Sequence, residues 1–96
     1  MSGVTKHGLL DLAKAATADR GLNYGKAEDN FDRIAARWRV HLKNRFGLDI
    51  ALDAVSVALM MADMKLARLE HQPGHLDSYV DLAGYAACGA EIAAKG

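Results

Sequence analysis

The sequence predicts an all-α protein, a compact bundle of about four helices that forms a single domain over residues 1–96. Three observations predict this class. Apolar residues recur at steps of three and four through four segments of the chain. Glycine or proline interrupts the pattern between these segments. The chain also contains fewer Val, Ile, Thr and aromatic residues than the strands of a sheet require.

The first predicted helix covers residues 5–18. Its apolar stripe has helical spacing and consists of Leu9, Leu10, Leu12, Ala13 and Ala16. Residues 20–25 follow, and the glycines at 21 and 25 can adopt positive φ without strain. We therefore expect a turn there.

The second predicted helix covers residues 27–46 and is amphipathic. Its apolar face consists of Phe31, Ile34, Ala35, Trp38, Leu42 and Phe46. Acidic residues lie near its start, and Lys43 and Arg45 lie in its last turn, as the helix dipole favours. Gly47 is a natural terminator.

The third predicted helix covers residues 53–70, with Asp53 as its N-cap. Its first part, residues 54–62, is apolar nearly all round. A helix of that composition is expected to be buried on most sides.

The fourth predicted helix covers residues 77–94 and is rich in alanine and glycine. Small side chains allow helices to approach closely. This helix is therefore expected either at the centre of the bundle or at a contact between subunits. Together with the short chain, it predicts a homo-oligomer.

Composition excludes several classes of protein. The net charge is zero with histidine neutral, which argues against a general electrostatic grip on nucleic acid or on an acidic membrane. No segment approaches the ~20 apolar residues that span a bilayer. The first residues lack a long apolar signal core. Cys88 is the sole cysteine, so no internal disulfide can form, and we expect a cytoplasmic protein.

Two acidic groups are candidate metal ligands, Glu28 with Asp29 and Asp32, and Asp77 with Asp81. Within each group, carboxylates at i and i+4 share a helix face and repel one another unless a cation lies between them. Mg²⁺, or Mn²⁺ in its place, suits oxygen ligands. The alternatives are that the first group only favours a helix start and that Asp77 is an N-cap. Asp81 lies in an otherwise apolar stretch, which indicates a paired or liganded carboxylate.

Lys65 and Arg68 lie one turn apart on the third predicted helix. They could bind a phosphate, or they could neutralise Asp77 and Asp81. Tyr24 and Lys26 flank a glycine in the first predicted turn, from which they could reach a ligand. The alternative is a turn that packs its tyrosine against the core.

Three motifs, weak singly and specific together, suggest a family. The first reads Asp19-Arg20-Gly21-x-x-Tyr24-Gly25-x-x-Glu28-x-Asn30-Phe31-x-x-Ile34-Ala35-x-x-Trp38. The second reads Ala58-Leu59-Met60-Met61-x-x-Met64-Lys65-x-Ala67-Arg68. The third reads Asp77-x-x-x-Asp81-x-Ala83-Gly84-Tyr85-Ala86.

These motifs resemble a family of small uncharacterised proteins from phages and prophages, over residues 19–94. That family resembles more distantly the MazG-like all-alpha nucleotide pyrophosphohydrolases, which bind Mg²⁺ through two acidic motifs and are usually oligomers. The resemblance implies that Glu28, Asp29 and Asp32 form the first motif and that Asp77 and Asp81 stand for the second. The chain has two aspartates where glutamates are usual, and three residues rather than two between the later acids.

The leading hypothesis is therefore a Mg²⁺-dependent nucleotide-binding protein of phage type in the host cytoplasm, which cleaves nucleoside triphosphates to monophosphate and pyrophosphate. Glu28, Asp32 and Asp81 would be catalytic, and Lys65, Arg68, Tyr24 and Lys26 would bind the substrate. One alternative is a binder that captures a nucleotide signal without turnover. The other is a structural oligomerisation module without a ligand.

Overall fold

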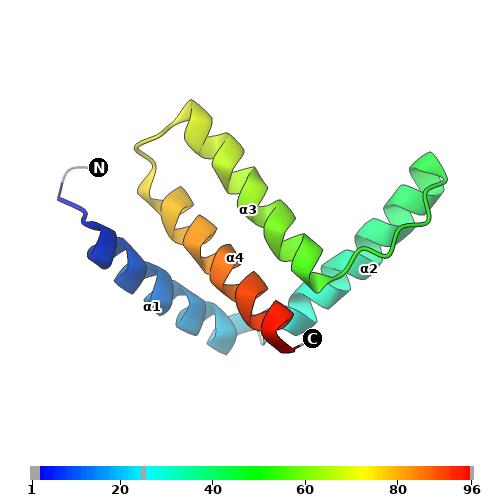
Figure 1. The fold of residues 1–96 in the computed structure, drawn as a ribbon, viewed down its shortest axis with the longest axis horizontal. Helices are drawn as coiled ribbons and strands as arrows, with labels where there is room; N and C mark the ends of the chain where they lie inside the picture. Colours follow the sequence, from blue (N-terminus) through cyan, green and yellow to red (C-terminus); the bar gives the residue numbers. More distant parts are fainter. Residues whose placement is uncertain (1–2, 25, 96) are drawn as a thin grey trace.

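The computed structural model describes residues 3–24 and 26–95, without the side chains of residues 22–24. The described chain forms α1 (Lys6–Tyr24), α2 (Ala27–Phe46), α3 (Ala54–His71) and α4 (Leu76–Lys95). The predicted all-α fold is confirmed. Helix α4 lies between α1 and α3, whereas α2 crosses near the bottom of the bundle and extends away from it (Figure 1).

Helix α1 is longer than the sequence predicts. It begins after Thr5, whose Oγ1 accepts a hydrogen bond from the Gly8 N–H at 3.0 Å. It then continues through Gly21 to Tyr24, so residues 20–24 of the predicted turn are helical instead, and Gly25 lies outside the described residues. The break before α2 is therefore shorter than predicted. A single glycine inside a helix costs only about 1 kcal/mol, which contacts with other helices can offset.

Helix α2 ends where the sequence predicts. Gly47 adopts φ 69° and donates its N–H to the carbonyls of Leu42 and Lys43. The last part of α2 and the segment that follows it, residues 39–53, form an arm that points away from the other helices (Figure 1). The Arg39 guanidinium holds the returning segment along the helix by donating to the Leu52 carbonyl.

Helix α3 starts as predicted but is less buried than predicted. Asp53 is its N-cap, with its side chain accepting from the Ser56 N–H at 2.9 Å. One face is buried, formed by Ala54, Val57, Ala58, Ala62 and Leu69. The opposite side exposes four large apolar side chains, Leu59, Met60, Met64 and Leu66. The expectation of burial on most sides is wrong because α4 and the first half of α2 cover only one side of α3.

The small residues of α4 place it at the centre of the bundle. Gly84 faces α1, where an added Cβ would meet the Thr17 Cγ2 at 3.4 Å. Gly89 faces α3, where an added Cβ would lie 3.3 Å from the Ala58 Cβ. Helix α4 begins at Leu76, so Asp77 lies in its first turn and is not its N-cap.

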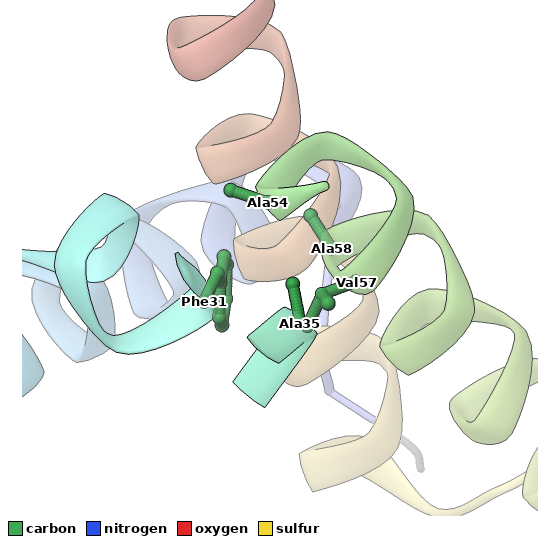
Figure 2. Close-up of a cluster of buried hydrophobic side chains, with 5 residues drawn as sticks. All are labelled: Phe31, Ala35, Ala54, Val57 and Ala58. Atoms are coloured by element: carbon green, nitrogen blue, oxygen red, sulfur yellow. The ribbon is translucent and has the colours of Figure 1, made fainter. Parts of the chain in front are cut away.

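The main hydrophobic cluster joins the first half of α2 to the first turns of α3. Figure 2 shows its five buried side chains, which are Phe31, Ala35, Ala54, Val57 and Ala58. Tyr85, Cys88 and Ile92 of α4 pack against it from the other side. The cluster thus lies at the crossing of three helices and fixes the base of the arm.

Over the ranges that the structure describes, none of the helices combines the length and the hydropathy that a bilayer-spanning helix requires.

Candidate functional site

A cavity of about 800 Å³ opens between α1, α2 and α4. This volume falls in the range of roughly 300–1,000 Å³ that is usual for small-molecule sites. Its more buried lining is apolar and consists of Phe31, Ile34, Met61, Tyr85, Cys88 and Ile92. Its charged lining is mostly exposed and consists of Lys14, Arg20, Lys26, Glu28, Glu91 and Lys95.

The charged lining has a positive balance, with four cations and two carboxylates among the described residues. Lys95 Nζ lies 3.6 Å from Glu28 Oε2, a long contact at the end of α4. Lys14 and Lys26 form no ion pair with any part of the chain that is described. Their charge therefore remains available to an anion that enters the cavity.

Two aromatic rings lie in the apolar lining. The centroids of Phe31 on α2 and Tyr85 on α4 are 6.2 Å apart, with 48° between the ring planes. The Phe31 ring is almost fully buried, whereas Tyr85 is half-buried. A planar apolar ligand could therefore reach the Tyr85 ring more readily than the Phe31 ring.

Asp81 lies elsewhere, in an ion-pair network that joins three helices. Its Oδ1 lies 2.5 Å from Arg20 Nη2 of α1, and its Oδ2 lies 3.0 Å from Lys65 Nζ of α3. Burial raises the pKa of Asp81, but the hydrogen bonds and charges of Arg20 and Lys65 outweigh that effect and hold the pKa below its usual 3.8. Asp81 is thus a paired carboxylate, one of the two interpretations of its place in an apolar stretch.

The two predicted acidic groups lie far apart within one chain. Glu28 is near Lys95, and Lys95 lies fourteen positions after Asp81, which corresponds to about 21 Å along a helix. Asp77 is further still from Glu28 and is exposed. In one chain, the structure does not bring these groups into a common metal site.

The three members of the first acidic group, Glu28, Asp29 and Asp32, do not share one site. Glu28 and Asp32 line a second cavity of about 430 Å³, together with Asp53, and Glu28 also lines the first cavity. Asp29 is exposed and lines neither. Among the residues described, no three His, Cys, Asp or Glu side chains are arranged to hold a metal ion.

The predicted substrate-binding residues do not lie together in the structure. Lys26 lines the large cavity, at the start of α2. Lys65 and Arg68 do not line it, since Lys65 contacts Asp81, and Arg68 Nη2 lies 3.4 Å from His75 Nε2. Tyr24 ends α1, but its side chain lies outside what the structure describes.

Sequence reasoning missed Lys14, Arg20, Tyr85 and Lys95 as cavity residues. Arg20 was missed because the sequence predicted a turn at residue 20, and a residue in a turn was not assigned to a helix face. Lys14 lies between two residues of the predicted apolar stripe of α1, Ala13 and Ala16, and could have been noticed as a polar residue at the border of that stripe. Nothing in the sequence near Tyr85 or Lys95 indicates a cavity, because only the packing of α4 brings these residues close to α2.

The fold and site define a class, a small all-α domain with a basic, aromatic-lined cavity between its helices. Residues 8–93 match the family described as a domain of unknown function, DUF6378, and the chain belongs to that family. The predicted membership of an uncharacterised family is confirmed, and the two relatives that follow confirm its phage kinship. The likeness to MazG-like pyrophosphohydrolases stays a prediction.

Two relatives are proteins of mycobacterial viruses. The chain is 36% identical over 80 residues to the "Gene 55 protein" of Mycobacterium phage D29, covering 83% of this chain and 49% of that protein. It is 36% identical over 78 residues to the "Gene 55 protein" of Mycobacterium phage L5, covering 81% of this chain and 47% of that protein. The chain thus spans about half the length of these relatives. No solved structure matches it significantly.

Proposed function

We propose that this domain binds a nucleotide in the cavity between α1, α2 and α4. The observation that carries the proposal is the pairing of an apolar, aromatic-lined interior with a basic edge in one cavity of about 800 Å³. A nucleotide has the complementary parts, a planar base that suits the apolar interior and anionic phosphates that suit the basic edge.

The phosphates would lie against Lys14 and Lys26, whose charges no described carboxylate neutralises. Ammonium groups bind phosphate as compact point charges. The base would contact the half-buried Tyr85 ring and the aliphatic side chains beside it. This arrangement supports binding and does not require Lys65 or Arg68, which lie elsewhere, Lys65 in an ion pair with Asp81 and Arg68 in a hydrogen bond with His75.

A second candidate function is Mg²⁺-dependent cleavage of a nucleoside triphosphate to monophosphate and pyrophosphate. The observation that favours it is that Glu28 borders both cavities, beside Asp32. Two carboxylates suit Mg²⁺, which keeps several waters and takes its remaining ligands from substrate phosphates. Glu28 and Asp32 would hold the ion, which would neutralise phosphate charge. Asp81 would act only by fixing α1 and α3 against α4.

Relationship to proteins of two mycobacteriophages supports a phage or prophage origin for the chain. The proposal then places the protein in the host cytoplasm, where nucleotides and Mg²⁺ are abundant. Either sequestration of a nucleotide or its hydrolysis would be useful to a phage there.

The binding proposal is tested by thermal unfolding with a panel of nucleoside mono-, di- and triphosphates, with and without Mg²⁺. A ligand that binds only the folded state at a hundredfold excess over Kd adds about 2.7 kcal/mol, which raises the Tm of a domain this small by roughly 10 °C or more. Lys14→Ala and Lys26→Ala should reduce the rise. Lys6→Ala, an exposed lysine outside the cavity, should leave it unchanged. No shift with any nucleotide would leave the oligomerisation module without a ligand as the remaining hypothesis.

Turnover separates the two candidate functions. Release of pyrophosphate that requires Mg²⁺ and falls at least tenfold in Glu28→Gln would establish the hydrolase. Asp29→Asn is the matched control, because Asp29 neighbours Glu28 in sequence and lines neither cavity. Binding without release of pyrophosphate would leave the non-catalytic binder.

A further inference from the structure

The chain exposes more surface than a compact monomer of its size. Its accessible area is 6716 Å² for a mass of 10.3 kDa, whereas monomers of that mass expose about 5,400 Å². Its radius of gyration is 14.8 Å, against about 12.5 Å for a compact chain of this length. The excess area is about 1,300 Å², more than the roughly 800 Å² that each partner buries in a stable complex.

The exposed apolar surface is concentrated on one part of the molecule. Of the ten large hydrophobic side chains that are exposed among the described residues, eight lie on the arm or on α3. The arm exposes Val40, Phe46, Leu48 and Ile50, and α3 exposes Leu59, Met60, Met64 and Leu66. The other two, Leu10 and Leu12, point to different sides of α1 because they are two residues apart on a helix.

The arm and the outer face of α3 (defined by its four exposed apolar side chains) carry opposite charge patterns. The part of the arm that belongs to α2, residues 39–46, contains three basic residues and no acidic one. The returning segment adds Asp49, which pairs with Lys43, and the N-cap Asp53, so the arm keeps a net charge of +1. On α3, Asp63 follows Leu59 by four residues and Glu70 follows Leu66 by four, so exposed carboxylates lie beside the apolar side chains. The arm of one chain therefore matches the outer face of α3 of another chain in both hydrophobicity and sign of charge.

We infer that two copies of this chain form a twofold dimer in which the arm of each copy packs across the outer face of α3 of the other. Twofold symmetry makes this contact twice, so both arms and both α3 faces are covered together. The arm extends clear of its own bundle in Figure 1, which leaves it accessible to a second copy. The contact assigns oligomerisation to α2 and α3 and not to the glycine-rich α4, which is occupied inside the bundle.

The dimer is tested by analytical ultracentrifugation of the 96-residue chain between 1 and 100 µM. The wild type is expected at twice 10.3 kDa. Met60→Glu and Val40→Glu, one on each side of the contact, should each raise the dimer dissociation constant at least tenfold. Leu10→Glu is the matched control, since Leu10 is 58% exposed and lies on α1, and it should leave the dissociation constant within twofold of the wild type. Circular dichroism of each variant confirms that it remains helical.

Three outcomes would overturn the inference. One is a wild-type chain that stays monomeric up to 100 µM, which would mean that something other than a second copy covers this surface. The second is a dimer that Leu10→Glu dissociates and Met60→Glu does not. The third is a dimer that neither Met60→Glu nor Val40→Glu weakens. None of these outcomes bears on nucleotide binding, because the cavity residues lie on other faces of the helices.

Discussion

The two sides of α4 differ in how closely other helices approach them. On the side of α3, Gly89 lies so near Ala58 that an added Cβ would be 3.3 Å from the alanine Cβ. Ser78, which lies eleven residues before Gly89 and so on the same face of the helix, is fully buried. On the side of α1 and α2, a cavity of about 800 Å³ separates the helices around Tyr85. The same small-residue helix therefore contacts α3 closely on one side, and on the other it borders a cavity beside its contact with Thr17 of α1.

This difference separates the residues that stabilise the fold from those of the proposed binding site. Burial of apolar surface and close packing on the α3 side contribute folding free energy, and changes of volume there are costly. On the cavity side, polar and charged residues meet solvent, so substitutions there can change ligand affinity with little effect on unfolding. Asp81 belongs to neither side alone, since it binds both α1 and α3.

The largest effect is expected from filling the close contact. Gly89→Leu should lower the free energy of unfolding by about 2–3 kcal/mol, because the added side chain forces α3 away from α4. Ala90→Leu is the control, since Ala90 is exposed on the next position of the same helix. Urea unfolding of both variants measures the difference. Equal stability of the two would show that the α3–α4 contact is looser than described.

A smaller loss is expected at Asp81. Asp81→Asn removes the negative charge between Arg20 and Lys65, and leaves a Lys65 side chain that is only 16% exposed without its counter-ion. We expect a loss of about 1–2 kcal/mol near neutral pH, below the value for fully buried pairs because the network is partly solvated. Asp77→Asn, at an exposed position in the first turn of α4, should lower the free energy of unfolding by only about 0.3–0.5 kcal/mol. A comparable loss in both variants would contradict the anchoring role of Asp81.

Acid should remove the contribution of Asp81. Its pKa in the folded protein is lower than 3.8, its usual value, so the stabilising effect is complete above that value and declines as the pH falls through the folded pKa. The stability gap between the wild type and Asp81→Asn should therefore be constant from about pH 7 to 5 and shrink below about pH 4. The hydrogen bond from the Ser56 backbone also lowers the pKa of Asp53, but that residue is present in both proteins and cancels in the difference. A gap that widened in acid would contradict the ion pair.

The smallest effect concerns the part of α1 beside the cavity. Gly21 lies inside the helix with nothing within 4 Å of an added Cβ. Gly21→Ala should therefore raise stability by about 0.5–1 kcal/mol through helix propensity. Thermal unfolding measures the gain. A loss of stability instead would support the turn that the sequence suggested there.

Local features of the sequence were sufficient to predict most of the helices. The steps of three and four from Phe31 to Phe46, with Gly47 after them, gave α2 its observed bounds. Asp53 was recognisable as an N-cap, because its capping hydrogen bond involves only the backbone N–H three residues ahead, that of Ser56. The start of α3 and the ends of α4 were predicted to within one residue for the same reason. The end of α1 was missed because Gly21 weakens the local pattern, and only contacts with distant residues show that the helix continues.

The candidate site was less predictable. The sequence identified Glu28 and Asp32 as candidate metal ligands and Lys26 as a candidate substrate-binding residue, and all three line one or both of the two cavities. The pairing of Asp81 with Arg20 joins residues 61 positions apart, and the spacing of neither residue indicates the other. Similarly, the i, i+4 acids around Glu28 and Asp81 look alike in sequence, although one group borders a cavity and the other lies in an ion-pair network.

The sequence by itself determined the helical class, the breaks after α2 and α3 and the small-residue character of α4, because each depends on interactions within one or two turns of chain. Only the tertiary structure decided which side of α3 is exposed, which cations border the cavity and which carboxylate is neutralised. These features depend on how α4 lies between α1 and α3 and where α2 crosses them (Figure 1). That arrangement arises from long-range packing, which brings together residues that carry no sign of one another in the chain.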